Sequence, residues 1–105
     1  MRFVETTIFT RQVQSLLSDD EYRALQSALV LRPEQGSLIR NSGGLRKIRW
    51  GSRGSGKRGG IRAIYYWDLS TDRFFMLFAY SKSMQGDLTA EQVRILSRVV
   101  KEEFK

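Results

Sequence analysis

Two long apolar segments near the middle of the chain constrain its fold more than any other feature. Residues 61–69 are rich in β-branched and aromatic side chains, and residues 74–80 are apolar at every position. Ser70, Thr71 and Asp72 separate the two segments and are typical of a tight turn. A strand that is apolar at consecutive positions needs cover on both faces. The two segments therefore predict a β-hairpin whose second strand lies inside a sheet and not at its edge.

A third strand is expected to extend this hairpin into an antiparallel meander. Residues 45–50 combine apolar side chains with three basic ones, and a glycine-rich, basic connection over 51–60 leads from them into the hairpin. Leu45 and Ile48 are three positions apart, so a regular strand would point them to opposite faces. This pattern leaves the register open and allows a β-bulge within 45–50.

The N-terminal third of the chain predicts a strand followed by a helical hairpin. Residues 3–7 are rich in apolar and β-branched side chains, which favours a strand, and residues 8–17 place apolar side chains on one helical face. Ser18 and Glu21 have the S-x-x-E spacing of a capping box, which begins a second helix. Pro33 ends that helix.

The remaining segments predict a loop over 34–44 and a C-terminal helix. Thr89 and Gln92 have the spacing of a second capping box, and apolar residues continue a helical stripe from there to the C-terminus. Helices segregated from a meander predict an α+β fold, with a small antiparallel β-sheet, an N-terminal helical hairpin and a C-terminal helix. A length of 105 residues favours a single domain spanning 1–105.

The positive charge of the chain is concentrated in one segment. The formal net charge is +7, and no Asp or Glu occurs between Glu34 and Asp68. Eight of the nine glycines lie in the same segment, where the backbone can approach a ligand closely. This composition favours a partner rich in phosphate groups, and the alternative is a solvated basic loop. The basic residues of the segment are Arg40, Arg46, Lys47, Arg49, Arg53, Lys57, Arg58 and Arg62.

Two motif matches in this segment do not indicate a nucleotide site. Residues 54–59 match G-x-G-x-x-G, but a dinucleotide fingerprint opens a helix and this match precedes a predicted strand. Residues 51–57 match G-x-x-x-x-G-K, but Arg58 stands where a phosphate-binding loop needs Ser or Thr. The chain contains no His and no Cys, the commonest metal ligands and catalytic side chains. We therefore expect neither a metal nor a small-molecule cofactor.

The hydropathy of the chain does not indicate a membrane protein. No run approaches the ~20 apolar residues that cross a bilayer. Glu5 lies among the first residues, where a secretory signal would need a basic and then an apolar block. We expect a cytoplasmic protein without a membrane partner.

Arg62 is the basic residue best placed to hold a phosphate rigidly. It begins the strand predicted over 61–69, and alternation puts it on the same face as Ile64 and Tyr66. Sites on strands are more precise than sites on loops. The alternative is an arginine at a sheet edge that projects into water. The aromatic side chains that could stack on bases are Tyr65, Tyr66, Trp67 and Tyr80. Aromatic residues on strands more often belong to the core, which we favour for Trp67, and the role of Tyr66 and Tyr80 is left open.

Four motifs follow one another in an order shared with a known family. They are GGLRKIR at 43–49, GKRGGIRAIYY at 56–66, YSK at 80–82, and DLT at 87–89 followed by Gln92. Over nearly the whole chain this order resembles the RelE/HigB toxins of bacterial type II toxin–antitoxin systems, most closely their HigB branch. The resemblance implies a RelE-like fold and a small endoribonuclease that cuts mRNA in the ribosomal A site. It also implies a cognate antitoxin protein that holds the toxin inactive.

The resemblance assigns roles to individual residues. Arg62 matches the strand arginine that contacts the scissile phosphate, and Lys82 falls at the basic position after the last strand. The residues that match the basic RNA-binding face are Lys47, Arg49, Lys57 and Arg58. Arg46, Arg53 and Tyr66 complete the expected RNA- and ribosome-binding set.

The chain departs from the family near its final helix. Several RelE toxins have a catalytic Tyr there, where this chain has Asp87, Leu88 and Thr89. Cleavage of this kind needs no metal, because the ribose 2′-OH attacks its own adjacent phosphate. The general base is left open between Lys82, Tyr80 and a group of the ribosomal RNA.

Two other functions fit the same sequence. ParE toxins resemble RelE in architecture but inhibit DNA gyrase without catalysis. A basic RNA-binding module without chemistry is the second alternative. The concentrated basic segment with Arg62 and Lys82 favours the endoribonuclease, because a protein ligand of gyrase does not require it.

Overall fold

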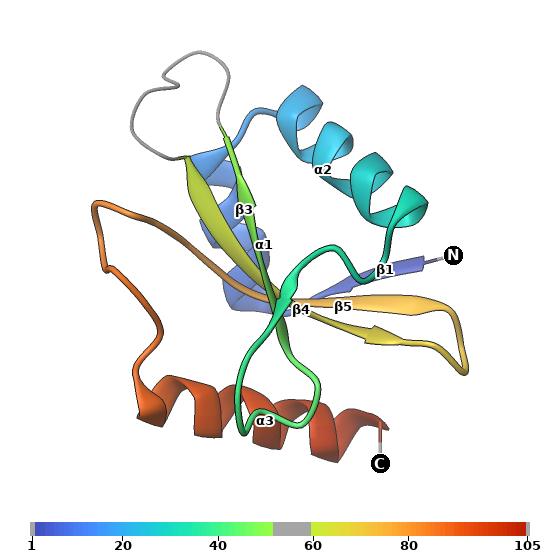
Figure 1. The fold of residues 1–105 in the computed structure, drawn as a ribbon. Coiled ribbons are helices and arrows are strands. Elements are labelled where there is room, and N and C mark those ends of the chain that lie inside the picture. Colours follow the sequence, from blue (N-terminus) through green and yellow to red (C-terminus); the bar gives the residue numbers. More distant parts are fainter. Residues whose placement is uncertain (1, 52–59, 105) are drawn as a thin grey trace.

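A computed structural model describes residues 2–51 and 60–104 of the chain, and in this part a five-stranded sheet carries helices on both faces (Figure 1). The elements in chain order are β1 (Arg2–Glu5), α1 (Thr7–Leu16), α2 (Asp19–Leu31), β2 (Ser37–Leu38), β3 (Arg46–Trp50), β4 (Ile61–Asp68), β5 (Arg73–Ser81) and α3 (Ala90–Phe104). The strands lie in the order β1-β5-β4-β3-β2. The α+β fold with a helical hairpin and a C-terminal helix is confirmed.

The sheet is mixed, because β1 pairs with β5 in parallel. Strands β2 to β5 are antiparallel neighbours, so the expected β3-β4-β5 meander is confirmed. In β1, Phe3 lies opposite Phe74 and the two rings stack with centroids 4.8 Å apart. A strand as short as β1 has the same apolar pattern in either direction, so its sequence does not decide between parallel and antiparallel pairing. Because β4 occupies one edge of β5, β1 pairs with the other edge.

Alternation along the strands divides the buried side chains into two layers. Phe9, Leu25 and Leu29 of the helical hairpin pack on one face of the sheet, against Ala63 and other strand residues. On the other face, Leu96 and Val100 of α3 pack in one cluster with Leu45, which directly precedes β3, and with four strand residues: Ile64, Phe75, Leu77 and Tyr80. The sheet is thus covered on both sides, as the apolar run over 74–80 predicts.

The cover on both faces also explains the apolar pattern of residues 45–50, of which β3 comprises 46–50. Leu45 and Ile48 are both buried, and they belong to opposite layers. No bulge is needed within 45–50, where the expectation allowed one. The irregularity lies instead between β4 and β5, where Ile64 pairs with Phe78 but the next residue, Tyr65, pairs with Met76.

Both predicted capping boxes are present. The Ser18 hydroxyl accepts the Glu21 N–H at 3.1 Å, and the Glu21 carboxylate accepts the Ser18 N–H at 2.8 Å. At α3, the Thr89 hydroxyl accepts the Gln92 N–H, and the Gln92 side-chain oxygen accepts the Thr89 N–H. These reciprocal bonds satisfy backbone donors that a helix start leaves without intrahelical partners.

The segment 34–44, expected to be a loop, contains the two-residue strand β2. Tyr65 holds the chain just before it: its hydroxyl accepts the Gly36 N–H at 3.0 Å and donates to the Pro33 carbonyl oxygen at 2.7 Å. Arg46 Nη1 donates to the carbonyl oxygens of Glu34 and Gly36. A strand of two residues has no periodic pattern that the sequence could show. The hydrogen bonds of Arg46 on β3 and Tyr65 on β4 position β2 instead. Tyr65 is fully buried and is therefore a core residue and not a surface for bases.

We expect Tyr65→Phe to lower the free energy of unfolding by about 1–3 kcal/mol, because it leaves the buried Gly36 N–H without its acceptor. Chemical denaturation would measure the loss. Ser15→Ala, which removes an exposed hydroxyl from α1, serves as the control. Equal stability of the two variants would show that the Tyr65 hydroxyl does not anchor β2.

Candidate nucleic-acid interface

The three basic residues of β3 do not lie on one face of the sheet. In the strand register, Lys47 is the partner of Ile64 and Arg49 is the partner of Arg62, so both point to the layer that α3 covers. Arg46 is the partner of Tyr65 and points to the helical hairpin. Of the expected RNA-binding residues, the structure therefore separates Arg46, which donates to backbone carbonyl oxygens, from Lys47 and Arg49.

A cross-strand row of three side chains forms the centre of the candidate site. Arg49 on β3, Arg62 on β4 and Tyr80 on β5 are successive partners in the register. Arg49 is exposed, whereas Arg62 is only 6% exposed. Arg62 lies in the middle of the sheet and not at an edge, so the alternative of an arginine that projects into water is wrong. The predicted shared face of Arg62, Ile64 and Tyr66 is confirmed by the packing of the last two in the α3 layer.

The hydroxyl of Tyr80 is buried beside this arginine. Tyr80 is 1% exposed, and among the described residues its hydroxyl has no hydrogen-bond partner. Burial raises the pKa of Tyr80, the negative charge of Asp87 raises it further, and the positive charge of Arg62 lowers it. The phenol is therefore uncharged at neutral pH and suits a proton donor better than a general base.

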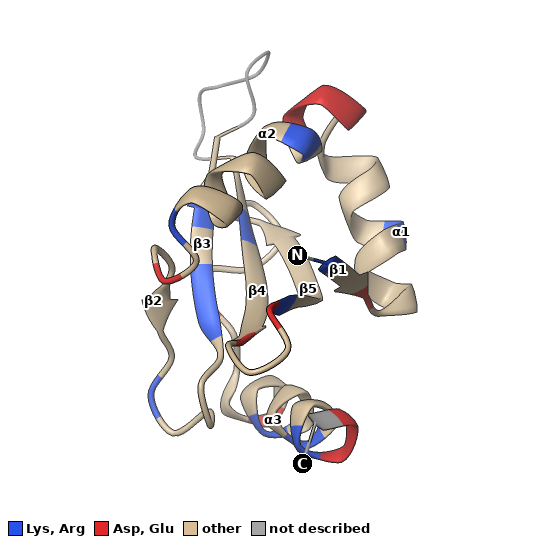
Figure 2. Ribbon diagram, turned by 90° about the vertical axis from the view of Figure 1, so that its right-hand side faces the viewer, with Lys and Arg blue, Asp and Glu red and all other residues tan. Residues whose placement is uncertain are grey.

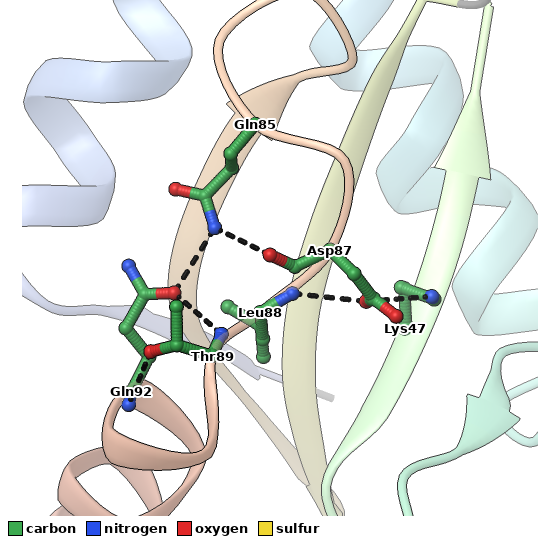
Figure 3. Close-up of polar contacts among 6 residues, drawn as sticks. All are labelled: Lys47, Gln85, Asp87, Leu88, Thr89 and Gln92. Atoms are coloured by element: carbon green, nitrogen blue, oxygen red, sulfur yellow. Dashed lines mark hydrogen bonds and ion pairs between the residues drawn. The ribbon is translucent and has the colours of Figure 1, made fainter.

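Asp87 brings a carboxylate into the same site. It lies on the segment 82–89 that joins β5 to α3, and its Oδ1 lies 3.1 Å from Lys47 Nζ (Figure 3). The same oxygen accepts the Leu88 N–H at 2.9 Å. The hydrogen bond from Lys47, then that from Leu88, and the charges of Lys47 and Arg62 hold the pKa of Asp87 below its usual range. The carboxylate is therefore ionised at neutral pH.

Sequence reasoning missed Asp87 as part of the site. It noted this residue only within the DLT motif and as a departure from a family tyrosine, and nothing in local spacing relates it to Lys47, 40 positions earlier. The one sequence signal is its place two residues before Thr89, where the capping box of α3 fixes the end of the segment. The contact with Lys47 depends on how β3 and that segment meet in space.

Lys82 follows β5 directly and is exposed. The last residue of β5, Ser81, pairs with Ile61, which places Lys82 at the end of the sheet where the row containing Arg62 lies. A turn begins here, in which the Met84 N–H donates to the Ser81 carbonyl oxygen. The structure thus brings Lys82 to the same end of the sheet as Arg62 and Tyr80.

Tyr66 is half-buried on the α3 side, and its ring lies against Gly44. Gly44 has φ +109°, and a Cβ there would meet Tyr66 Cε1 at 3.0 Å. Glycine is therefore required both by the backbone and by the close ring. Three further expected RNA-binding residues, Arg53, Lys57 and Arg58, lie outside the described residues.

Residues 2–51 and 60–104 contain no group of three or more His, Cys, Asp or Glu side chains that could hold a metal ion. No helix in this range is long and apolar enough to cross a membrane. Figure 2 shows basic residues along β3 and at the start of β4.

Cations spaced along a sheet suit the repeated phosphates of a nucleic acid better than a single small anion. Fold and site therefore define a small, basic α+β protein with one buried arginine and exposed cations at the same end of its sheet. Over residues 1–105 the chain matches the family model for the RelE toxin of the RelE/RelB toxin–antitoxin system, and it belongs to this family. Membership indicates a toxin of a type II toxin–antitoxin system and implies a cognate antitoxin as its partner.

We expect Lys47→Met to raise the pKa of Asp87 toward the ordinary aspartate value, because Lys47 supplies the main hydrogen bond to its carboxylate. A lowered folded pKa stabilises the fold above the unfolded pKa, and this contribution is lost as the pH falls through the folded value. NMR titration of the side-chain carboxyl carbons would measure the shift. Asp68, whose pKa is lowered mainly by the Thr71 hydroxyl, is the internal control and should not move. An unchanged Asp87 titration would show that the pair does not form in solution.

Proposed function

We propose that this toxin is a ribosome-dependent mRNA endoribonuclease of the HigB branch, which cuts mRNA in the ribosomal A site and is neutralised by its antitoxin. The observation that carries the proposal is the row formed by Arg49, Arg62 and Tyr80, in which a buried guanidinium lies beside a buried hydroxyl. Such a pair can hold a phosphate and donate to it. Because its target is the translating ribosome, we place the protein in the cytoplasm.

The reaction proposed for this site is an internal transfer. The ribose 2′-oxygen forms a bond to the adjacent phosphorus and the P–O5′ bond breaks, which leaves a 2′,3′-cyclic phosphate and a 5′-hydroxyl. A base takes the 2′-OH proton, and an acid gives one to the leaving oxygen. Arg62 neutralises the charge that builds on the phosphorane, and a fixed donor of this kind contributes about 3–4 kcal/mol to the transition state. This reaction consumes no metal and no cofactor.

Within this mechanism the uncharged Tyr80 hydroxyl is the proton donor. Because the phenol keeps its proton at neutral pH, it can donate without a prior ionisation, and its place next to Arg62 in the register supports contact with the same phosphate. The base is then Lys82 or a group of the ribosomal RNA. Lys47 and Arg49 bind flanking phosphates, and we keep Arg53, Lys57, Arg58 and Tyr66 as further contacts to RNA or ribosome.

We expect Arg62→Ala to lower the rate of mRNA cutting by about 100- to 1,000-fold, since it removes the donor that faces the developing charge. Primer extension on mRNA in a purified translation reaction, with and without ribosomes, would measure the cuts. Arg11→Ala removes one exposed positive charge from α1 and is the matched control. Arg62→Lys preserves a charge at the buried position if the alanine variant does not fold.

The same experiment separates the alternatives. Cuts within codons that appear only with ribosomes and only for the parent and Arg11→Ala support the proposal. Intact mRNA together with broken DNA in growth-arrested cells would contradict it in favour of gyrase inhibition. Bound but uncut RNA would favour a binding module without chemistry.

We expect Lys82→Ala to lower the saturating rate by about 100-fold or more if Lys82 is the general base. Tyr80→Phe keeps the ring in the α3 layer and removes only the hydroxyl, so it tests the proton donor without emptying the core. Single-turnover cleavage would measure both variants. Normal cutting by Lys82→Ala would exclude it and leave the base to the ribosome.

A further inference from the structure

The ion pair between Lys47 and Asp87 joins β3 to the segment that follows β5. Beyond its contacts with Lys47 and Leu88, Asp87 is held through its own backbone, because its carbonyl oxygen accepts a hydrogen bond from Gln85 Nε2 at 2.8 Å (Figure 3). The same Gln85 nitrogen donates to the side-chain oxygen of Gln92 at 3.0 Å. The carboxylate therefore belongs to a segment that has hydrogen bonds of its own besides the contact with Lys47.

The start of α3 does not explain why this carboxylate reaches β3. Thr89 and Gln92 complete the capping box of the helix by themselves. The side chain of Asp87 is 71% exposed, and an exposed ion pair adds little to the stability of a fold. Neither capping of α3 nor stability of the fold therefore explains the contact. Its effect on the position of the Lys47 ammonium is the better explanation.

Lys47 is the partner that gains order from the contact. A lysine ammonium is a point charge on a flexible four-carbon stem, and a free one samples many positions. Here the side chain is 28% exposed and ends on a carboxylate that also lies within electrostatic reach of Arg62 and Tyr80. A cation whose position is set before the substrate arrives need not be ordered during the reaction, and such preorganisation raises the rate.

We propose that Asp87 is a positioning residue of the cleavage site: its carboxylate holds the Lys47 ammonium beside the row of Arg49, Arg62 and Tyr80, where the RNA backbone passes. The inference rests on the proposed function and adds to it a residue that does not touch the RNA. Two other roles predict different results. An anion that merely competes with RNA phosphate would weaken binding in the parent, and a purely structural contact would matter only for stability.

The test is a double-mutant cycle in single-turnover cleavage of ribosome-bound mRNA, with the saturating rate and the half-saturating toxin concentration measured separately. The variants are Asp87→Ala, Lys47→Ala and the double variant. Asp20→Ala is the matched control, since it removes the carboxylate of the exposed ion pair with Arg23 on α2. Asp87→Asn retains an oxygen that can accept the Leu88 N–H, and serves if the alanine variant unfolds.

We expect Asp87→Ala and Lys47→Ala each to lower the saturating rate about tenfold, and the double variant also about tenfold and not a hundredfold, because Asp87 acts through Lys47. The half-saturating toxin concentration of Asp87→Ala should equal that of the parent, and its thermal midpoint should match that of Asp20→Ala. Asp87→Asn should lose several-fold in rate at unchanged stability.

Three results would overturn the positioning role alone, in a parent that cuts normally. The first is a saturating rate of Asp87→Ala equal to that of the parent. The second is a rate loss near a hundredfold in the double variant. The third is a half-saturating toxin concentration of Asp87→Ala below that of the parent at full rate, which would identify Asp87 as a competing anion. A parent chain that cuts no ribosome-bound mRNA would instead overturn the proposed function, and the positioning role with it.

Discussion

The burial of the β4–β5 ladder on both faces is the constraint on which the rest of the structure depends. Once α1 and α2 cover one face and α3 the other, alternation along each strand assigns its residues to a layer, and the irregularity opposite Ile64 and Tyr65 shifts that alternation once in β5. A charged side chain inside such a sheet is costly unless it is partnered or reaches the rim. Arg62 is the buried cation that this arrangement holds in place, between Arg49 and Tyr80 in the register. The packing that stabilises the fold therefore also makes the central guanidinium rigid.

Around that rigid centre the other charges are held by weaker and more local contacts. Lys47 and Asp87 meet in an exposed pair, and Lys82 lies in the turn after β5. The site thus combines one cation fixed by the core with others on its rim that a long polyanion can reach. For the RNA substrate that we propose, this division would hold one phosphate accurately and only attract its neighbours.

Much of the fold follows from local patterns. The caps at Ser18 and Thr89 mark their helices, and the apolar run over 74–80 places its strand inside a two-sided sheet. The parallel pairing of β1 and the short strand β2 do not follow, since the first depends on a free sheet edge and the second on distant side chains such as Tyr65. The separation of Arg46 from its neighbours was available in the sequence, because adjacent strand residues point to opposite faces.

The sequence by itself determined the layered α+β fold, the concentration of positive charge between Glu34 and Asp68, and a chemistry that uses neither His nor Cys. These properties depend on composition and on short-range periodicity. Only the tertiary structure decided that Arg62 and the Tyr80 hydroxyl are buried side by side, and that Asp87 meets Lys47. The reason is physical: burial and through-space contact depend on which distant segments cover a residue, and no local pattern encodes that cover.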